Sequence, residues 1–457
     1  MSVDLPLTVD RDTGRPLSAQ LVAQLRAAMG EGRLAAGERL PASRALAGLL
    51  GVSRTVVTEA YEQLYAEGWL EGRHGSGTYV TEGVAAPPAP ESRPVTVETA
   101  FRTAGQGEID LTPGAPWVGA LDTPAWRRAW RIAAGMPPQQ RQDPHGLPGL
   151  RVALADYVRR SRGVTCHADG LLVTRGATNG LDLLAATVLR PGDRVGVEEP
   201  GYRRARAVLA GRGAELVPCP VDEHGLVVDG LPDGLRLICT TPSHQFPMGG
   251  VLPVPRRQAL LAWARRNGAL VAEDDYDGEF RYDVAPLPAL YGLDPDVVVY
   301  LGTTAKILTA DLAVGWLVAR PDLVGRIARC RRELNDRTAV VPQDALRLLL
   351  ERGDLERHVR RMRGEYARRR DVAVRALEGL PLRGDTAGLH LVVDVPAEVA
   401  GRVVRGARRR GVLVETLDRH HAGAPRASGL VIGYGSAASR EELRKGCEIV
   451  RRLARTG

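Results

Sequence analysis

Apolar residues near the N-terminus recur at the spacing of one helical face. Residues 17–29 predict an amphipathic helix, and residues 40–50 predict a second one, opened by Ser43 or its neighbour as the cap. A tight glycine-containing turn precedes a third predicted helix over 54–67, which Ser53 can cap. Two helices joined by such a turn are typical of a helix-turn-helix, although a plain helical bundle also fits this periodicity.

The segment after these helices predicts a β-hairpin. Within residues 68–80, two short runs of β-prone residues flank a glycine-rich tip, which is the pattern of two strands joined by a short connection. A hairpin in this place forms the wing of a winged helix.

Farther along the chain, apolar residues form short continuous runs instead of periodic stripes. Residues 269–272 and 297–301 are almost entirely apolar, which is typical of strands buried on both faces of a sheet. The first run ends in the acidic segment 273–277, and the second leads through small and hydroxyl residues to Lys306. We therefore expect a carboxylate and a lysine to meet near the ends of two strands.

A proline- and alanine-rich segment divides the chain between these two regions. It has no helical period, and such a composition forms an extended spacer rather than a packed element. We therefore predict one domain over residues 1–81, a linker over 82–100 and a second domain over 101–457.

The composition fits a globular chain and narrows its surroundings. Among its 457 residues, 44% are hydrophobic, and no apolar run approaches the length of a membrane span. The N-terminus lacks the pattern of a signal peptide, and the five scattered cysteines lack metal-ligand spacing. We expect a cytoplasmic protein with free thiols, no metal site and no membrane partner. The net charge of +8 suggests a polyanionic partner, although residues 1–81 carry eight arginines against nine acidic residues.

Lysine is almost absent from the chain, which makes Lys306 a candidate for covalent chemistry. Only Lys306 and Lys445 are lysines among 62 basic residues. Arginine suffices for a solvated positive charge, but its guanidinium stays protonated and does not attack a carbonyl. A lysine beside a carboxylate is what pyridoxal phosphate needs, because the lysine forms a Schiff base with the aldehyde and the carboxylate keeps the pyridine nitrogen protonated. The alternative is a leftover surface lysine.

Strings in the first domain resemble the winged-helix DNA-binding domain of GntR-family regulators. They are Leu-Pro-Ala-Ser-Arg-Ala-Leu-Ala at 40–47, Leu-Gly-Val-Ser-Arg at 50–54, Gly-Trp-Leu at 68–70 and Gly-Ser-Gly-Thr-Tyr-Val at 75–80. The resemblance implies a double-stranded DNA operator as partner. The candidate DNA contacts lie at the second helix, the recognition helix and the wing, where they reach phosphates or base edges; they are Arg44, Ser53, Arg54, Thr55, Thr58, Arg73, His74 and Gly75. The alternative is that these arginines are solvated helix ends.

The second domain resembles the α/β fold-type I aminotransferases, and the whole chain resembles the MocR subfamily of GntR regulators. The strings that carry this resemblance are Asp-Pro-His-Gly-Leu at 143–147, Glu-Pro-Gly-Tyr at 199–202, Thr-Pro-Ser-His-Gln-Phe-Pro at 241–247, Glu-Asp-Asp-Tyr-Asp-Gly-Glu-Phe-Arg at 273–281 and Gly-Leu-His at 388–390. The resemblance implies pyridoxal phosphate as cofactor and a head-to-tail, domain-swapped homodimer.

The same resemblance implies roles for individual residues. Lys306 is the Schiff-base lysine, Asp274 contacts the pyridine nitrogen, and Tyr276 contacts the ring oxygen. Ala177 and Thr178 begin a helix after a small-residue turn, where backbone N–H groups suit a phosphate, and Thr303 lies near the same group. Tyr202 is placed to stack on the ring, and His244 is either structural or a further cofactor contact.

The sequence departs from these families at positions that contact the cofactor or the substrate. The family's lysine loop usually has serine before the lysine and, seven residues after it, an arginine that binds the cofactor phosphate. Ala305 and Ala313 stand there, and the loss of a bidentate charged contact weakens phosphate binding. We hypothesise that Arg141 of the neighbouring subunit replaces the guanidinium. Val431 stands where true aminotransferases bind the substrate carboxylate with arginine, which disfavours productive binding of an amino acid.

Two classes of function fit these observations. The first is a transcriptional regulator, rather than an enzyme, whose DNA affinity responds to an effector, either pyridoxal phosphate or an amino-acid-like adduct of it. The second is an active aminotransferase with an appended DNA-binding domain. In a third alternative the regulator has lost the cofactor.

Two stretches of the second domain, 357–370 and 402–410, are rich in arginine. They fit solvated helix faces, or else they extend the DNA contact over the second domain.

Overall fold

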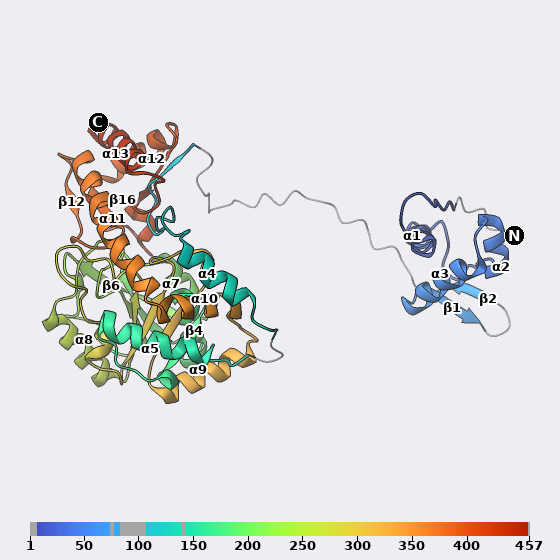
Figure 1. Ribbon diagram of the computed structural model, residues 1–457, viewed down its shortest axis with the longest axis horizontal. Coiled ribbons are helices and arrows are strands. Elements are labelled where there is room, and N and C mark those ends of the chain that lie inside the picture. The colour runs from blue at the N-terminus through green and yellow to red at the C-terminus, as the bar shows by residue number, and fades with distance from the viewer. Residues whose placement is uncertain (1–6, 74–76, 83–106, 139–141, 456–457) are drawn as a thin grey trace. The chain divides into compact units, whose positions relative to one another are not determined.

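The computed structural model describes residues 7–73, 77–82, 107–138 and 142–455 (Figure 1). The chain divides into two compact units, Met1–Arg102 and Thr103–Gly457. Three predicted contact residues lie outside the described residues, as does the predicted linker apart from residue 82; the three are His74, Gly75 and Arg141.

The first unit contains three helices and a hairpin. Its elements are α1 (Leu17–Gly30), α2 (Ser43–Leu50), α3 (Arg54–Ala66), β1 (Leu70–Arg73) and β2 (Gly77–Val80). A single apolar core that includes Leu21, Leu25, Val57 and Leu64 holds the helices together. The two strands pair antiparallel, with Leu70 opposite Val80. The predicted helix-turn-helix and hairpin are therefore confirmed.

The predicted caps are right in position, since Ser53 is the N-cap residue of α3 and Ala42, the neighbour of Ser43, is that of α2, but the expected side-chain hydrogen bonds are not formed. Ser43 is the first residue of α2, Ser53 precedes α3, and no side-chain cap is made at either helix start. The Ser43 hydroxyl instead accepts a 3.4 Å hydrogen bond from Nε of Arg54.

The second unit is built on an eight-stranded sheet. Its strands are β4 (Leu171–Thr174), β5 (Arg194–Glu199), β6 (Glu215–Asp222), β7 (Gly225–Leu226), β8 (Leu237–Thr240), β9 (Leu270–Asp275), β10 (Val298–Thr303) and β11 (Gly315–Val318). Their order is β4-β11-β10-β9-β8-β5-β6-β7. The central strands run parallel, whereas β11 is antiparallel to both neighbours. The two apolar runs predicted as strands are thus adjacent and parallel.

Helices cover both faces of this sheet (Figure 1). They are α4 (Pro124–Ala134), α5 (Pro148–Arg162), α6 (Ala177–Val188), α7 (Arg203–Gly211), α8 (Val254–Asn267), α9 (Pro321–Glu333) and α10 (Val340–Glu351). Successive residues of one strand enter different cores, since Val299 belongs to one apolar cluster and Tyr300 to the other. Burial on both faces accounts for the continuous apolar runs in the sequence.

The C-terminal part of the second unit forms a smaller lobe. Its elements are α11 (Asp354–Ala376), β12 (Leu382–Arg383), β13 (His390–Asp394), α12 (Ala397–Arg408), β14 (Val412–Leu413), β15 (Glu415–Thr416), β16 (Gly429–Gly433) and α13 (Arg440–Arg455). Strands β12, β13, β16 and β15 form an antiparallel sheet, and β14 pairs with β3 (Ile109–Asp110). Within the described residues, no helix has the length and apolar character that a membrane crossing requires.

Candidate cofactor site and DNA-binding face

Lys306 and Asp274 come from neighbouring parallel strands of the large sheet. Asp274 lies in β9 opposite Leu301 of β10, and Lys306 follows the end of β10 by three residues. The lysine ammonium donates a hydrogen bond to the carbonyl oxygen of Gly114. Burial lowers the pKa of Lys306 to about 8, although the charges of Asp277 and Asp274 oppose this shift. The lysine is therefore more easily deprotonated than an ordinary surface lysine.

Asp274 is a buried carboxylate whose Oδ1 has no hydrogen-bond partner among the described residues. Burial raises its pKa to about 7, the nearby Asp275 raises it further, and Lys306 opposes the shift. The adjacent carboxylates are satisfied elsewhere, since Glu273 accepts backbone N–H groups after β9 and Asp275 forms a buried ion pair with Arg162. Only Asp274 of these three offers an oxygen atom to a cationic or protonated partner.

The small-residue turn before α6 lies beside the end of β10. Gly176 has a φ of 107°, which favours glycine, and a side chain there would lie 3.7 Å from the Thr303 hydroxyl. Ala177 and Thr178 begin α6, and the Thr178 hydroxyl lies 3.4 Å from the Tyr202 hydroxyl. The structure therefore brings these predicted contacts together at a helix N-terminus that suits an anion.

The ring of Phe246 lies between two predicted cofactor contacts, Tyr202 and Tyr276. The Phe246 ring makes edge contacts with Tyr202, Tyr276, His390 and His420 at centroid distances of 5.1 to 5.9 Å. His390 and His420 belong to the smaller lobe, whereas Tyr202 and Tyr276 follow strands of the large sheet. This cluster of rings therefore forms only when the smaller lobe packs against the large sheet.

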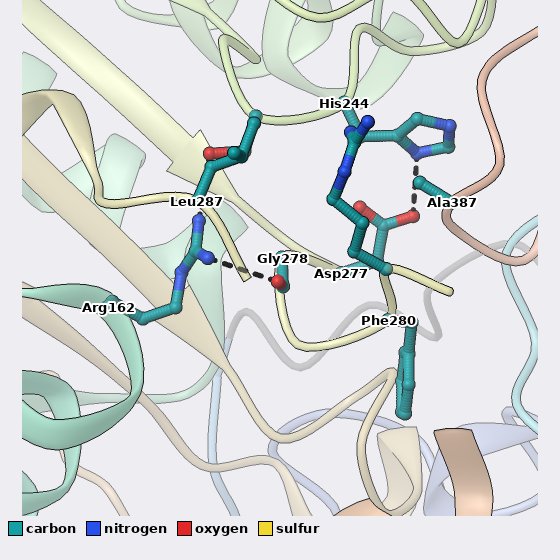
Figure 2. A pocket seen from close by; sticks show the side chains of 9 residues that line it. Arg162, His244, Asp277, Gly278, Phe280, Leu287 and Ala387 are labelled. Atoms are coloured by element: carbon teal, nitrogen blue, oxygen red, sulfur yellow. Dashed lines mark hydrogen bonds and ion pairs between the residues drawn. The ribbon is translucent and has the colours of Figure 1, made fainter. Parts of the chain in front are cut away.

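His244 is buried and fixed by two neighbours. Its Nδ1 lies 2.9 Å from Oδ2 of Asp277 and 2.9 Å from the hydroxyl of Tyr276. Figure 2 shows the contact between His244 and Asp277 beside a cavity of about 10 Å³, which is room for about one water molecule. His244 therefore contacts the tyrosine predicted to bind the cofactor's ring oxygen.

Besides Phe246 and Asp277, which were present only in the family strings, sequence reasoning missed Arg204, His390 and His420. The charge of Arg204, two residues after Tyr202, contributes to the lowered pKa of Lys306. His390 lies in the Gly-Leu-His string and His420 lies in none of the family strings, yet both pack on Phe246. Arg204 follows the predicted stacking residue Tyr202 by two positions, and this proximity is the one sequence feature that could have indicated it.

The three departures from the family pattern take different places in the structure. Ala305 is half-buried, whereas Ala313 is exposed and adopts a left-handed conformation with a φ of 47°. Val431 is fully buried in β16 and packs with Val392 and Leu417. An apolar cluster therefore surrounds the position at which true aminotransferases are expected to have a substrate-binding arginine.

The described candidate DNA contacts in the first unit are all exposed or partly exposed. Arg44 of α2 and Arg54 of α3 are exposed, Arg54 bonds Ser43 beside Arg44, and Ser53 and Thr55 are exposed next to them. Thr58 is partly exposed. Arg73 in the wing is exposed but paired with Glu71 and Glu82. The N-terminal end of α3 is thus exposed and carries an arginine.

A winged helix joined to a lysine-bearing, aminotransferase-like unit defines a class of regulators that bind DNA and carry an enzyme-derived domain. Residues 17–80 match the family of bacterial regulatory proteins of the gntR type, and residues 108–450 match the aminotransferases of class I and II. The chain belongs to the MocR subfamily of GntR-family transcriptional regulators, as its relatives show.

Two curated relatives span nearly the whole chain. The pyridoxine biosynthesis transcriptional regulator PdxR of Corynebacterium glutamicum is 38% identical over 95% of this chain and 96% of its own. The probable rhizopine catabolism regulatory protein MocR of Rhizobium meliloti is 35% identical over 94% of this chain and 92% of its own.

The fold of the second unit is shared with aminotransferases of known structure. Kynurenine aminotransferase of Pyrococcus horikoshii superposes with a TM-score of 0.70 at 24% identity, covering 76% of this chain and 90% of its own. LysN, the α-aminoadipate aminotransferase of Thermus thermophilus, superposes with a TM-score of 0.70 at 24% identity, covering 76% and 92%. These similarities establish the fold and nothing about catalysis.

Proposed function

We propose that this transcriptional regulator binds pyridoxal phosphate at Lys306 and that the bound cofactor, or an adduct of it, alters its affinity for DNA. The observation that supports this most is the buried Asp274 oxygen without a partner among the described residues, beside a lysine with a lowered pKa. A buried polar atom without a partner costs free energy. A protonated ring nitrogen satisfies this atom, so the residues present fit the cofactor.

Each residue of the site has a proposed task. Lys306 binds the aldehyde, Asp274 accepts a hydrogen bond from the ring nitrogen, and Tyr276, held by His244, donates to the ring oxygen. Tyr202 stacks on the ring, whereas Thr178, Thr303 and the backbone at Ala177 bind the phosphate. When bound, the cofactor supplies a reactive carbonyl and a ring that accepts electrons.

Two arginines are proposed to replace the guanidinium that Ala313 lacks. Arg204 lies close enough to the site to influence the pKa of both Lys306 and Tyr202. Arg141, outside the described residues, remains our second proposal, reaching the site from the partner of a head-to-tail dimer.

We also propose that the protein is located in the cytoplasm and that its domains span residues 1–81 and 101–457, joined by a linker over residues 82–100.

Sensing is favoured over turnover because of Val431. Its apolar surroundings offer no charge to a substrate carboxylate, and an amino acid that is poorly held reacts slowly. Effector control requires only that the ligand bind two arrangements of the protein with different affinity.

Attachment of pyridoxal phosphate is expected to accelerate as the pH rises to about 8 and to level off above it. Only the neutral amine attacks a carbonyl. Because the pKa of Lys306 is lowered to about 8, the amine loses its proton there and not near the usual 10.5. The measurement is the rate at which visible absorbance develops after mixing cofactor-free protein with pyridoxal phosphate. A rate that continues to climb well above this pH would contradict the lowered pKa.

Pyridoxal phosphate is expected to change the protein's affinity for DNA by about tenfold, which is a common size for coupling between two sites. The DNA is a duplex that the protein has selected from a random pool. The measurement is a titration of fluorescent duplex with and without the cofactor, and Lys306→Ala serves as the insensitive variant. Equal affinity under both conditions would refute the regulatory role. Steady amino transfer from common amino acids would establish the enzyme alternative instead.

A further inference from the structure

The exposed side of α12 carries arginine charges that have no carboxylate partner in the described part of the chain. The buried side of this helix consists of small and apolar residues, namely Ala400, Val403, Gly406 and Ala407. The opposite side, continued just past the helix end, presents the α12 arginine surface, which we define as Arg402, Arg405, Arg408 and Arg409. No ion pair of these four is formed among the described residues. Glu398, in the first turn, is the acidic residue of this helix.

The other arginine-rich stretch, on α11, is used differently. Arg369 is buried and donates to the carbonyl oxygens of Tyr434 and Ala437, while Arg363 donates to that of Glu279. Arg357 and Arg368 pair with acidic residues of their own helix. The expectation that this stretch is a solvated face is therefore wrong for its inward arginines, which tie α11 to the rest of the unit.

The distribution of charge along the chain makes the α12 arginine surface relevant to DNA binding. Residues 1–81 carry eight arginines and nine acidic residues, so the excess positive charge lies on the remainder of the chain. Attraction to the phosphate backbone depends on positive charge and supplies much of the affinity of DNA-binding proteins. The winged helix by itself supplies little of it.

We propose that the α12 arginine surface is a second DNA contact, which binds backbone phosphates of the duplex that the winged helix occupies. Guanidinium groups bind phosphate with paired, charge-assisted hydrogen bonds. Contacts of this kind position a protein on DNA without reading the sequence. Arg402 and Arg409 lie on one side of the helix about 10 Å apart along its axis, so more than one phosphate is within reach of this surface. The proposal rests on DNA binding by the first unit but not on the cofactor.

The test compares two charge reversals in the full-length protein. Arg405→Glu with Arg409→Glu alters the α12 arginine surface, whereas Arg326→Glu with Arg329→Glu makes the same change of charge on α9, where both side chains are exposed. Figure 1 shows α9 and α12 at different ends of the second unit. Binding is measured over a range of salt concentrations to the selected duplex and to a scrambled duplex.

The α12 variant is expected to bind both duplexes on the order of tenfold more weakly at low salt. Its plot of log affinity against log salt concentration should be shallower by about two, since each lost phosphate contact removes roughly 0.9 from the slope. The α9 variant should bind like the wild-type protein. Equal losses in the two variants would overturn the proposal in favour of a general effect of net charge. Unchanged binding of both duplexes by the α12 variant would overturn it as well.

The same measurements separate this proposal from failure of DNA binding itself. If the wild-type protein does not prefer the selected duplex, the regulatory function fails. If it does, and the α12 variant keeps that preference while its overall affinity falls, both conclusions stand. Circular dichroism of each variant establishes that the fold is retained.

Discussion

Replacing Lys306 by alanine is expected to abolish the visible absorption band of bound pyridoxal phosphate. Loss of the amine removes the covalent attachment, and a guanidinium such as that of the nearby Arg204 does not form it. Asp274 and the helix N-terminus at Ala177, which we propose as cofactor contacts, remain in this variant, so we expect weak, reversible binding to persist. The measurement is the absorption spectrum after incubation with the cofactor and removal of the excess.

The chain offers a matched control for this experiment. Lys445, the other lysine of the sequence, is exposed on α13 and lies 3.7 Å from Glu441. Lys445→Ala should therefore keep the band of the wild-type protein. A band that survives in Lys306→Ala would show that another group binds the aldehyde. Absence of the band in the wild-type protein would support a regulator that has lost its cofactor, as Ala305 and Ala313 suggest.

The elements that carry the site were predictable because their signals are local. Recognition helix α3 was expected over 54–67 and spans Arg54–Ala66, since apolar periodicity and the preceding turn lie within a few residues of it. Strands β9 and β10 were expected from continuous apolar runs, and burial on both faces of the sheet is the reason for those runs.

The rest of the site depends on contacts that no local pattern encodes. His390 is separated from Pro247 by 143 positions, yet the imidazole contacts that carbonyl oxygen at 3.0 Å. The position of β11 between β4 and β10 likewise follows from pairing across the sheet. Arg162, which bonds Asp275, was not singled out because a buried arginine resembles a surface arginine in sequence. Non-local packing thus determines which charges near Asp274 are neutralised.

Arg54→Ala is expected to weaken binding to the selected duplex by roughly 10- to 100-fold, about 1–3 kcal/mol, if this arginine contacts a guanine edge. Arg54 is exposed at the start of α3, and its Nε donates only a long hydrogen bond to Ser43. Arg73 should matter less, because Glu71 and Glu82 already bind its guanidinium. The measurement is titration of the selected and scrambled duplexes with each variant.

The ratio of the two affinities distinguishes base recognition from simple attraction. Loss of a base contact lowers affinity for the selected duplex more than for the scrambled one, whereas loss of a phosphate contact lowers both alike. Arg33→Ala removes the same charge from an exposed residue paired with Glu31 outside the helix-turn-helix and should change neither affinity. If Arg54→Ala leaves the ratio unchanged, Arg54 binds phosphate only, and selectivity must come from other residues of α3 or from the wing. A reduced ratio, together with an unchanged ratio in the α12 variant, places sequence recognition in the first unit and backbone attraction in the second.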